Sequence, residues 1–314
     1  MREKNKAMGA NLKEVRERIS SIKSTQQITK AMKMVSAAKL RKAQNAITQM
    51  RPYADKLNDM LTNILSNLED GDAVSSFGTE REIENAAVVV VTSTRGLCGA
   101  FNTNIVKEAS KVIEEKFAEH RRNKKLTIFF IGKKGYDGMK RKFADCTLNQ
   151  DHQDLFQDLG FDNISKVSQM LMDEFENKNF DNVTVCYARF KNAATTFPLA
   201  DQFLPVPKIE ADDTDLKQEE KEKKTGKADY IFEPSKKELL DHLIPSILQT
   251  KFQKYLLDTH ASEHGARMTA MSKATDNAED LIKELKITYN KARQEAITKE
   301  LSEIVGGAAA LESA

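Results

Sequence analysis

Residues 265–314 read GARMTAMSKATDNAEDLIKELKITYNKARQEAITKELSEIVGGAAALESA, and this stretch decides the fold of the chain. It contains no proline, and no glycine lies between Gly265 and the pair Gly306–Gly307. The residue types that dominate it, Ala, Leu, Lys, Glu, Gln and Met, are good helix formers. A seam recurs at alternating steps of three and four residues, which is the a/d spacing of a coiled coil. Its members are Met268, Met271, Thr275, Ala278, Ile282, Leu285, Tyr289, Ala292 and Ala296.

The seam fails at its next position, Lys299, and resumes one residue over. The shifted positions are Ile297, Leu301, Ile304, Ala308 and Leu311. A face that rotates in this way indicates a helix that leaves one partner and enters another environment. The helical pattern begins near Ser235, and Pro245 is the last proline of the chain. A helix that is continuous from there to Val305, about 60 residues, would be roughly 90 Å long. Charges recur at every turn, which excludes a membrane span and leaves a coiled coil or a machine part.

A second long helical pattern occupies residues 9–68, with Asn11 as the expected N-cap. Leu12, Val15, Ile19 and Ile22 start its own seam at steps of three and four. Pro52 should kink or break this helix, because proline removes a backbone hydrogen bond and crowds the preceding turn. The two terminal helices carry compatible seams, and the simplest arrangement pairs them as an antiparallel coiled coil.

The N-terminal helix is strongly basic. Between Gly9 and Arg51 there are ten Lys or Arg residues against Glu14 and Glu17, a local charge of +8 in a chain whose net charge is +2. Most basic helices simply present a solvated face, but this charge density favours an acidic partner surface.

Composition excludes several classes. A chain of 314 residues with 31% charged residues is polar for an enzyme and normal for long exposed helices. Cys98, Cys146 and Cys186 are widely spaced, which argues against disulfides or a zinc site and fits a reducing compartment. The first residues, MREKNKAMGAN, lack the apolar core of a secretory signal, so we expect a soluble, cytoplasmic protein that can still dock on a membrane complex.

Residues 83–206 have a different sequence pattern, in which short apolar runs typical of strands alternate with helical segments. The run Ala86–Val91 (AAVVVV) is typical of a buried, parallel strand, and Leu126–Ile131 of a second one. Further strands are expected at Asn182–Phe190 and Thr195–Leu204, with helices near Thr103–His120, Lys133–Phe143 and Ile164–Glu176. We therefore expect an α/β chain, with a small Rossmann-like domain inserted between the two long helices.

The remaining boundaries follow from this division. Residues 207–232 form a charged insertion, whose core Lys208–Asp229 holds six Lys and almost no apolar residue, so a flexible loop or solvated excursion is expected. The C-terminal long helix takes up residues 233–314.

Few motifs suggest chemistry. Gly96-Leu97-Cys98-Gly99 follows a strand, as phosphate-binding loops do, but it is shorter than GxGxxG, and GxxxxGK[ST] is absent. Cys98 would need a nearby base to act as a nucleophile, and the sequence names none. His260 and His264 have the spacing of a metal-binding pair on a helix, yet a third ligand is missing, so a surface pair is the better interpretation. We expect no catalytic residue, cofactor or metal.

Three hypotheses remain. The first is a mechanical or scaffolding chain. The second is a nucleotide-binding enzyme built on residues 83–206, which titration with ATP or a dinucleotide would test. The third is a basic coiled coil that binds nucleic acid, which would show steep salt dependence but is disfavoured by the nearly neutral C-terminal helix.

Three segments resemble the γ subunit of F-type ATP synthases, in that family's order and spacing. They are IKSTQQITKAMKMVSAAKLRKAQ (residues 22–44), TSTRGLCGAFNTN (residues 92–104) and ASEHGARMTAMSKATDNAEDLIKELKITYNKARQEAITKELSEIVGGAAAL (residues 261–311). The resemblance covers both termini and the glycine loop, and it is of the bacterial type. It implies a central rotor shaft without a catalytic site of its own.

The resemblance also implies partners and a location. The terminal helices would enter the ring of three α and three β subunits, and the α/β domain would lie against the ε subunit and the ring of c subunits. Proton-driven rotation of that ring would then drive the catalytic β subunits through their states in ATP synthesis. The chain would be a peripheral subunit at the cytoplasmic face of the inner (plasma) membrane, and nucleic acid would not be a partner.

Individual residues carry over from the family's motifs. Lys30, Met32, Lys33 and Arg267 match residues that meet the acidic lever loop of β. Contacts with the β catch loop are implied for Arg293, Gln294 and Thr298. The tip that turns in an apolar sleeve would include Ile304, Val305, Ala308 and Leu311.

This sequence departs from the family pattern at Gly265, where alanine is usual, at a local cost of about 1 kcal/mol in a helix interior. Lys33 stands where many relatives carry an acidic residue. The Lys208–Asp229 stretch is longer and more charged than in many relatives, and it contains no cysteine. Thiol regulation of the chloroplast kind is therefore not expected.

Overall fold

The computed structural model describes residues 12–66, 76–78, 81–193, 195–206 and 236–312. Contacts divide the chain into two compact units. The helical unit contains the chain up to Ala37 and from Arg267 onward, and the globular unit is residues 38–266. The expected N-cap Asn11 and the charged insertion at residues 207–232 lie outside the described residues.

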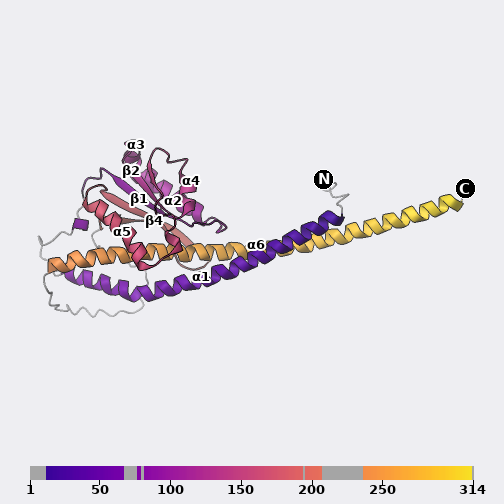
Figure 1. Cartoon of the computed structure of the whole chain (residues 1–314), viewed down its shortest axis with the longest axis horizontal. Helices are drawn as coiled ribbons and strands as arrows, with labels where there is room; N and C mark the ends of the chain where they lie inside the picture. The colour runs from indigo at the N-terminus through magenta and orange to yellow at the C-terminus, as the bar shows by residue number, and fades with distance from the viewer. Residues whose placement is uncertain (1–11, 67–75, 79–80, 194, 207–235, 313–314) are drawn as a thin grey trace. The chain divides into compact units, whose positions relative to one another are not determined.

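Two long helices contribute to both units. Helix α1 is Leu12–Ser66 and helix α6 is Lys236–Glu312. In the helical unit the start of α1, drawn in indigo, runs alongside α6 (Figure 1). The less exposed positions of α1 there follow the predicted three-and-four spacing. They are Leu12, Val15, Ile19, Ile22, Gln26, Thr29, Met32 and Ser36, and Ala37 beside Ser36 is partly buried as well.

Helix α1 continues through Pro52, so of the predicted kink or break, the break does not occur. Proline at this position loses one backbone hydrogen bond. Packing offsets the loss, because Leu40, Ala43 and Leu57 are buried on the two sides of Pro52. Tertiary contacts here outweigh the local preference of the sequence.

The globular unit is built on a five-stranded sheet with the order β3-β2-β1-β4-β5. Strands β1 to β4 are parallel, and β5 is antiparallel to β4. The strands are β1 Ala86–Val91, β2 Leu126–Ile131, β3 Thr147–Asn149, β4 Asn182–Phe190 and β5 Thr196–Leu204. Strand β3 was not predicted from the sequence, since three partly exposed residues carry too short a pattern to be recognised.

Strand β1 lies at the centre of the sheet, and all six of its side chains are buried. Ala87, Val89 and Val91 belong to one core, whereas the alternate residues of the strand belong to the core on the other face. A strand covered on both faces must be apolar throughout, which explains the unbroken AAVVVV run.

Helices cover the two faces. On the first, α5 (Phe161–Glu176) and residues 248–256 of α6 pack against the sheet through Leu171, Phe175 and Phe252. On the second, α2 (Phe101–Lys116) and α4 (Lys133–Met139) bury Ile105, Ile113 and Met139. Helix α3 (Ala118–Arg122) and the 3₁₀ turns Ser76–Gly78 and Leu155–Gln157 complete the described elements. The predicted fold class, an α/β domain inserted between two long packed helices, is confirmed.

Candidate functional site

The helical unit holds most of the residues that were nominated from the sequence. Among the described residues, cross-helix hydrogen bonds join α1 to α6. Arg16 Nη2 donates to the Tyr289 hydroxyl over 2.8 Å, which raises the pKa of Arg16. The Thr29 and Thr275 hydroxyl oxygens lie 2.8 Å apart, and Lys33 Nζ donates to Ser272 Oγ over 2.9 Å. The seam is therefore polar in part and held by specific pairs.

The structure separates the nominated lever-loop residues by exposure. Lys30 is exposed, and Lys33 is exposed but bonded to Ser272. Met32 is half-buried on the seam side of α1. Arg267 is only 7% exposed, so very little of its surface is available to a partner.

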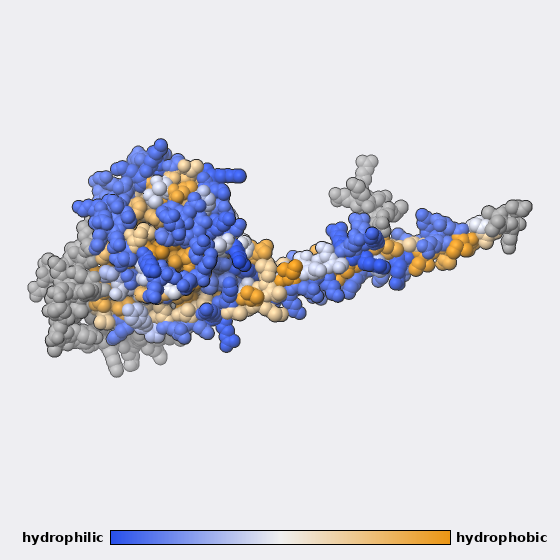
Figure 2. Space-filling view, in the orientation of Figure 1, coloured by the Kyte–Doolittle hydropathy of each residue, from blue (hydrophilic) through white to orange (hydrophobic). Residues whose placement is uncertain are grey.

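The seam of α6 ends where its sequence pattern fails. Ile282, Leu285, Tyr289, Ala292 and Ala296 are all partly buried. From residue 297 to residue 308 every described side chain is exposed, including Ile304 at 67%. In Figure 2 apolar residues colour one side of this last part of α6. The structure therefore presents a helix end without a partner among the described residues of the chain.

The nominated tip and catch-loop residues lie on this end. Val305, like Ile304, is 67% exposed, and Ala308 is exposed as well. The side chain of Leu311 lies outside the described residues. Arg293, Gln294 and Thr298 are exposed on α6, and Thr298 Oγ1 donates to the Gln294 carbonyl over 2.9 Å.

An apolar patch on the outside of α1 was not predicted from the sequence. Ile28, Met34 and Val35 are between 57% and 61% exposed, on the side of α1 away from the seam. Ile28 and Val35 are seven residues apart and so share a helix face. The seven-residue spacing of Ile28 and Val35 could have been recognised in the sequence, but each of the two lies directly beside a residue of the seam.

Polar groups of the glycine loop after β1 are hydrogen-bonded to the first turn of α2. Cys98 is buried, and Asn102 Nδ2 donates to its Sγ over 3.2 Å. Asn102 Oδ1 in turn accepts from the Ser93 backbone N–H over 3.0 Å. The first turn of α2, where a phosphate would bind in a nucleotide site, instead anchors the loop that precedes it.

Backbone N–H groups at the start of α4 are hydrogen-bonded within the chain as well. Gly135 N donates to Thr92 Oγ1 over 2.7 Å, and Lys134 N donates to the Ser93 carbonyl over 3.1 Å. Gly132 has φ +89°, and a Cβ there would lie 2.0 Å from the Thr92 carbonyl oxygen. Close approach of the chain to itself explains this glycine. The carboxyl ends of β1 and β2 are thus filled by backbone, which argues against the nucleotide-binding hypothesis.

The other cysteines are unsuited to nucleophilic chemistry. Burial raises the pKa of the half-buried Cys146 to about 11 and that of the fully buried Cys186 to about 12. A thiol with so high a pKa carries almost no thiolate near neutral pH. Cys186 packs in the core on the α2 face of the sheet.

The interpretation of His260 and His264 as a surface pair is wrong. His264 is 5% exposed, and His260 is half-buried with its ring stacked on Phe156. The sheet domain packs against this turn of α6, which periodicity alone could not reveal. In the part of the chain that the structure describes, no three His, Cys, Asp or Glu side chains converge as metal ligands.

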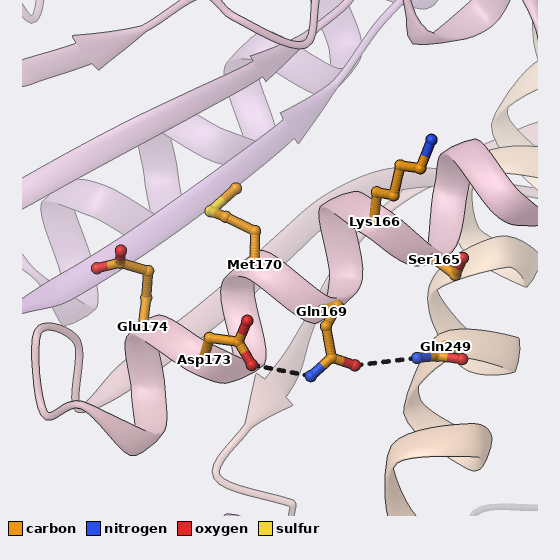
Figure 3. Close-up of a pocket in the computed structure, with 7 residues that line it drawn as sticks. All are labelled: Ser165, Lys166, Gln169, Met170, Asp173, Glu174 and Gln249. Carbon is orange, nitrogen blue, oxygen red and sulfur yellow. Dashed lines mark hydrogen bonds between the residues drawn. The ribbon is translucent and has the colours of Figure 1, made fainter.

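A shallow groove of about 450 Å³ lies between α5 and α6 in the globular unit (Figure 3). Gln249 Nε2 donates to Gln169 Oε1 over 3.1 Å, and Gln169 Nε2 donates to Asp173 over 2.8 Å. The charged ends of Lys166 and Glu174 point away from this chain of bonds (Figure 3). Its polar groups bridge two helices and do not converge on a common point, as a ligand site requires.

None of the helices, in their described residues, is both long and apolar enough to cross a bilayer.

Comparisons with known proteins cover almost the whole chain. A family model described as ATP synthase matches residues 11–311. The ATP synthase gamma chain of Flavobacterium psychrophilum is 51% identical over 302 residues, 96% of this chain and 99% of that one. The gamma chain of Cytophaga hutchinsonii is also 51% identical, and that of Pelagibacter ubique is 40% identical, each over 96% of this chain.

Solved structures share the fold. A chain from the Euglena gracilis mitochondrial ATP synthase, in a structure of OSCP, F1 and the c-ring, aligns with a TM-score of 0.61 at 22% identity. The alignment covers 96% of this chain and 95% of that one. A second Euglena structure, of the rotor, gives a TM-score of 0.57 over 91% of this chain and 98% of that one. By its family model and its close relatives, the chain belongs to the ATP synthase gamma chains, the non-catalytic rotor subunits of that enzyme.

Proposed function

We propose that this chain is the central rotor shaft of an F-type ATP synthase, which couples proton-driven turning of a ring of c subunits to the conformational cycling of the catalytic β subunits. The observation that carries the proposal is the end of the seam at Ala296. Beyond it α6 continues to Glu312 with exposed apolar side chains. An exposed apolar helix face of this kind marks a surface that another protein covers, as an apolar sleeve in the catalytic head would.

We infer that the partners of this rotor shaft are the α and β subunits of the head, the ε subunit and the c-ring. In support, a chain of similar fold with a TM-score of 0.53 belongs to a structure of the central stalk and c-ring of the Tetrahymena thermophila mitochondrial ATP synthase. We place the chain as a peripheral subunit at the cytoplasmic face of the inner (plasma) membrane.

The proposed contacts with β differ in how the structure supports them. Lys30, Arg293, Gln294 and Thr298 are exposed and can reach a partner directly. The buried Arg267 would support the neighbouring surface more than touch a partner. The outward patch of Ile28, Met34 and Val35, with its basic surroundings, adds an apolar component to a contact that charge alone would leave weak.

The test is co-purification with the cognate α and β subunits, followed by an ATPase assay with and without this chain. We expect a complex of three α and three β subunits per copy, with sustained turnover. The chain alone should neither bind nor hydrolyse ATP. A chain that remains dispersed in the presence of cognate α and β would overturn the proposal.

The tip is tested separately by Leu301→Ser with Ile304→Ser. Both side chains are exposed, so the double variant should unfold at the same temperature as the parent chain. Assembly with α and β should nevertheless weaken. The exposed Ser302 provides a matched control, and Ser302→Ala should leave both measurements unchanged.

A further inference from the structure

Two imidazoles meet on one turn of α6 in the globular unit. The Nε2 atoms of His260 and His264 lie 3.1 Å apart, and the ring planes are nearly perpendicular, with centroids 4.5 Å apart. The i, i+4 spacing places both side chains on the same helix face. One imidazole therefore donates a hydrogen bond to the other, and the shared contact needs at least one neutral acceptor ring.

The surroundings hold the rings in place. The ring of His260 lies parallel to that of Phe156, with a centroid distance of 5.9 Å and an interplanar angle of 17°. His264 is almost fully buried, whereas His260 keeps part of its surface in contact with solvent. The pair is therefore partly accessible to solvent, through His260.

The distance between the two nitrogens suits a metal ion. With metal–nitrogen bonds of about 2.1 Å, two nitrogens 3.1 Å apart subtend about 95° at the metal. That angle is close to the right angle between neighbouring ligands of square-planar or octahedral Cu²⁺ and Ni²⁺. A tetrahedral Zn²⁺ would require the rings to separate by a few tenths of an ångström.

We propose that His260 and His264 form a two-imidazole site for a divalent late transition-metal ion, a property separate from rotor function. The ion would replace the proton shared by the two rings and would staple one turn of α6. Since no third side-chain ligand is near among the described residues, water would complete the coordination. By the order of stability of such complexes, Cu²⁺ should bind more tightly than Ni²⁺ or Zn²⁺.

The first experiment is Cu²⁺ titration of the full chain, followed by electron paramagnetic resonance of the bound ion. We expect one equivalent bound with nitrogen couplings from two imidazoles. His264→Gln should retain one imidazole coupling and bind at least ten-fold more weakly, and the double change with His260→Gln should lose both. His152→Gln, which removes a histidine outside the pair, is the matched control and should bind like the parent chain.

The second experiment needs no variant. Because the metal competes with protons for neutral imidazole, binding by the parent chain should weaken about ten-fold or more between pH 7.5 and pH 5.5. The melting temperature should rise on addition of Cu²⁺ at the higher pH. A spectrum of the parent chain without imidazole couplings, or equal binding by the folded double variant, would overturn the proposal. If the double variant does not fold, the parent spectrum and its pH dependence decide.

Discussion

The hydroxyl oxygens of Thr29 and Thr275 lie 2.8 Å apart across the seam of the helical unit. Each hydroxyl carries a single hydrogen, so one threonine donates across the seam while the other, which accepts that bond, donates to a carbonyl of its own helix, Gln26 for Thr29 or Met271 for Thr275. The pair therefore adds specificity to a seam whose neighbouring positions are apolar. It fixes which residues of the two helices face each other.

Substituting both threonines with valine should be nearly neutral for the free energy of unfolding, whereas each single change should cost about 1 kcal/mol. The reason is that a single change removes the hydrogen bond across the seam and sets a polar hydroxyl, which keeps only the carbonyl of its own helix as a partner, against a methyl group. A double-mutant cycle measured by denaturant unfolding checks this coupling. Thr288→Val is the control, because that exposed hydroxyl bonds to the Glu284 carbonyl of its own helix. Additive effects of Thr29→Val and Thr275→Val would contradict the prediction.

Gly265 is closely packed against Ala193, and its helical backbone conformation does not itself call for glycine. A Cβ at this position would lie 3.1 Å from both the Cα and the carbonyl oxygen of Ala193. Gly265→Ala should therefore fail to stabilise the chain, although alanine favours a helix over glycine by about 1 kcal/mol. Gly306→Ala is the matched control, with no atom within 4 Å of the added Cβ, and it should not destabilise. Thermal unfolding measures both, and a clear stabilisation by Gly265→Ala would exclude the crowding.

Asp258 makes the stability of the globular unit depend on pH. Burial raises the pKa of this carboxyl to about 6, and the nearby Lys254, Arg189 and Arg51 offset the effect only in part. The folded state thus holds the proton more tightly than the unfolded state does. The contribution of the protonated group to stability is complete below about pH 4 and is lost as the pH rises through about 6.

Asp258→Asn should therefore stabilise the chain at pH 8 by up to about 2 kcal/mol and change little at pH 4. Denaturant unfolding at the two pH values measures the difference. Asp55→Asn, a change at an exposed carboxylate of α1, is the control and should show no such dependence. An equal effect of Asp258→Asn at both pH values would show that the carboxyl does not titrate in this window.

Arg81 connects the segment before β1 to the end of α5. Its Nη2 donates to the carbonyls of Phe175 over 2.6 Å and Phe180 over 3.0 Å, and its Nε lies 2.9 Å from Asp181 Oδ1. The guanidinium also lies over the Phe175 ring, 4.4 Å from the centroid. A planar fork with several donors is needed for this set of contacts.

Arg81→Lys should therefore cost nearly as much as Arg81→Ala, about 2 kcal/mol. The control is Lys125→Ala, which removes the exposed ion pair with Glu84 and should cost less than about 1 kcal/mol. Chemical denaturation of the full chain compares the three variants. Full retention of stability in Arg81→Lys would mean that charge alone matters.

Charge on the basic helix should matter less than shape for the rotor. Single neutralisation at Lys30 should leave ATPase turnover of the assembled enzyme largely intact, because exposed ion pairs contribute about 0–1 kcal/mol each. Truncation past Lys299 should weaken assembly more. ATPase turnover of the complex with α and β measures the first effect, and co-purification with these subunits measures the second. An inactive but fully assembled Lys30→Ala enzyme would reverse this ranking.

Much of this architecture could be predicted because it rests on local periodicity. The seam from Met268 to Ala296 and the unbroken AAVVVV strand are written in neighbouring residues, and their burial follows the pattern. Even the loss of the seam at Lys299 could be read in this way, since a charged residue at a seam position cannot be buried without a partner. These features are determined by the sequence itself.

Tertiary structure decided the rest. Whether α1 survives Pro52, whether His264 is buried, and why residue 265 is glycine all depend on atoms distant in sequence, such as Phe156 and Ala193. Periodicity states which face of a helix is apolar but not what packs against the other faces. Only the folded chain brings those neighbours together, because burial and close contact are properties of the three-dimensional arrangement.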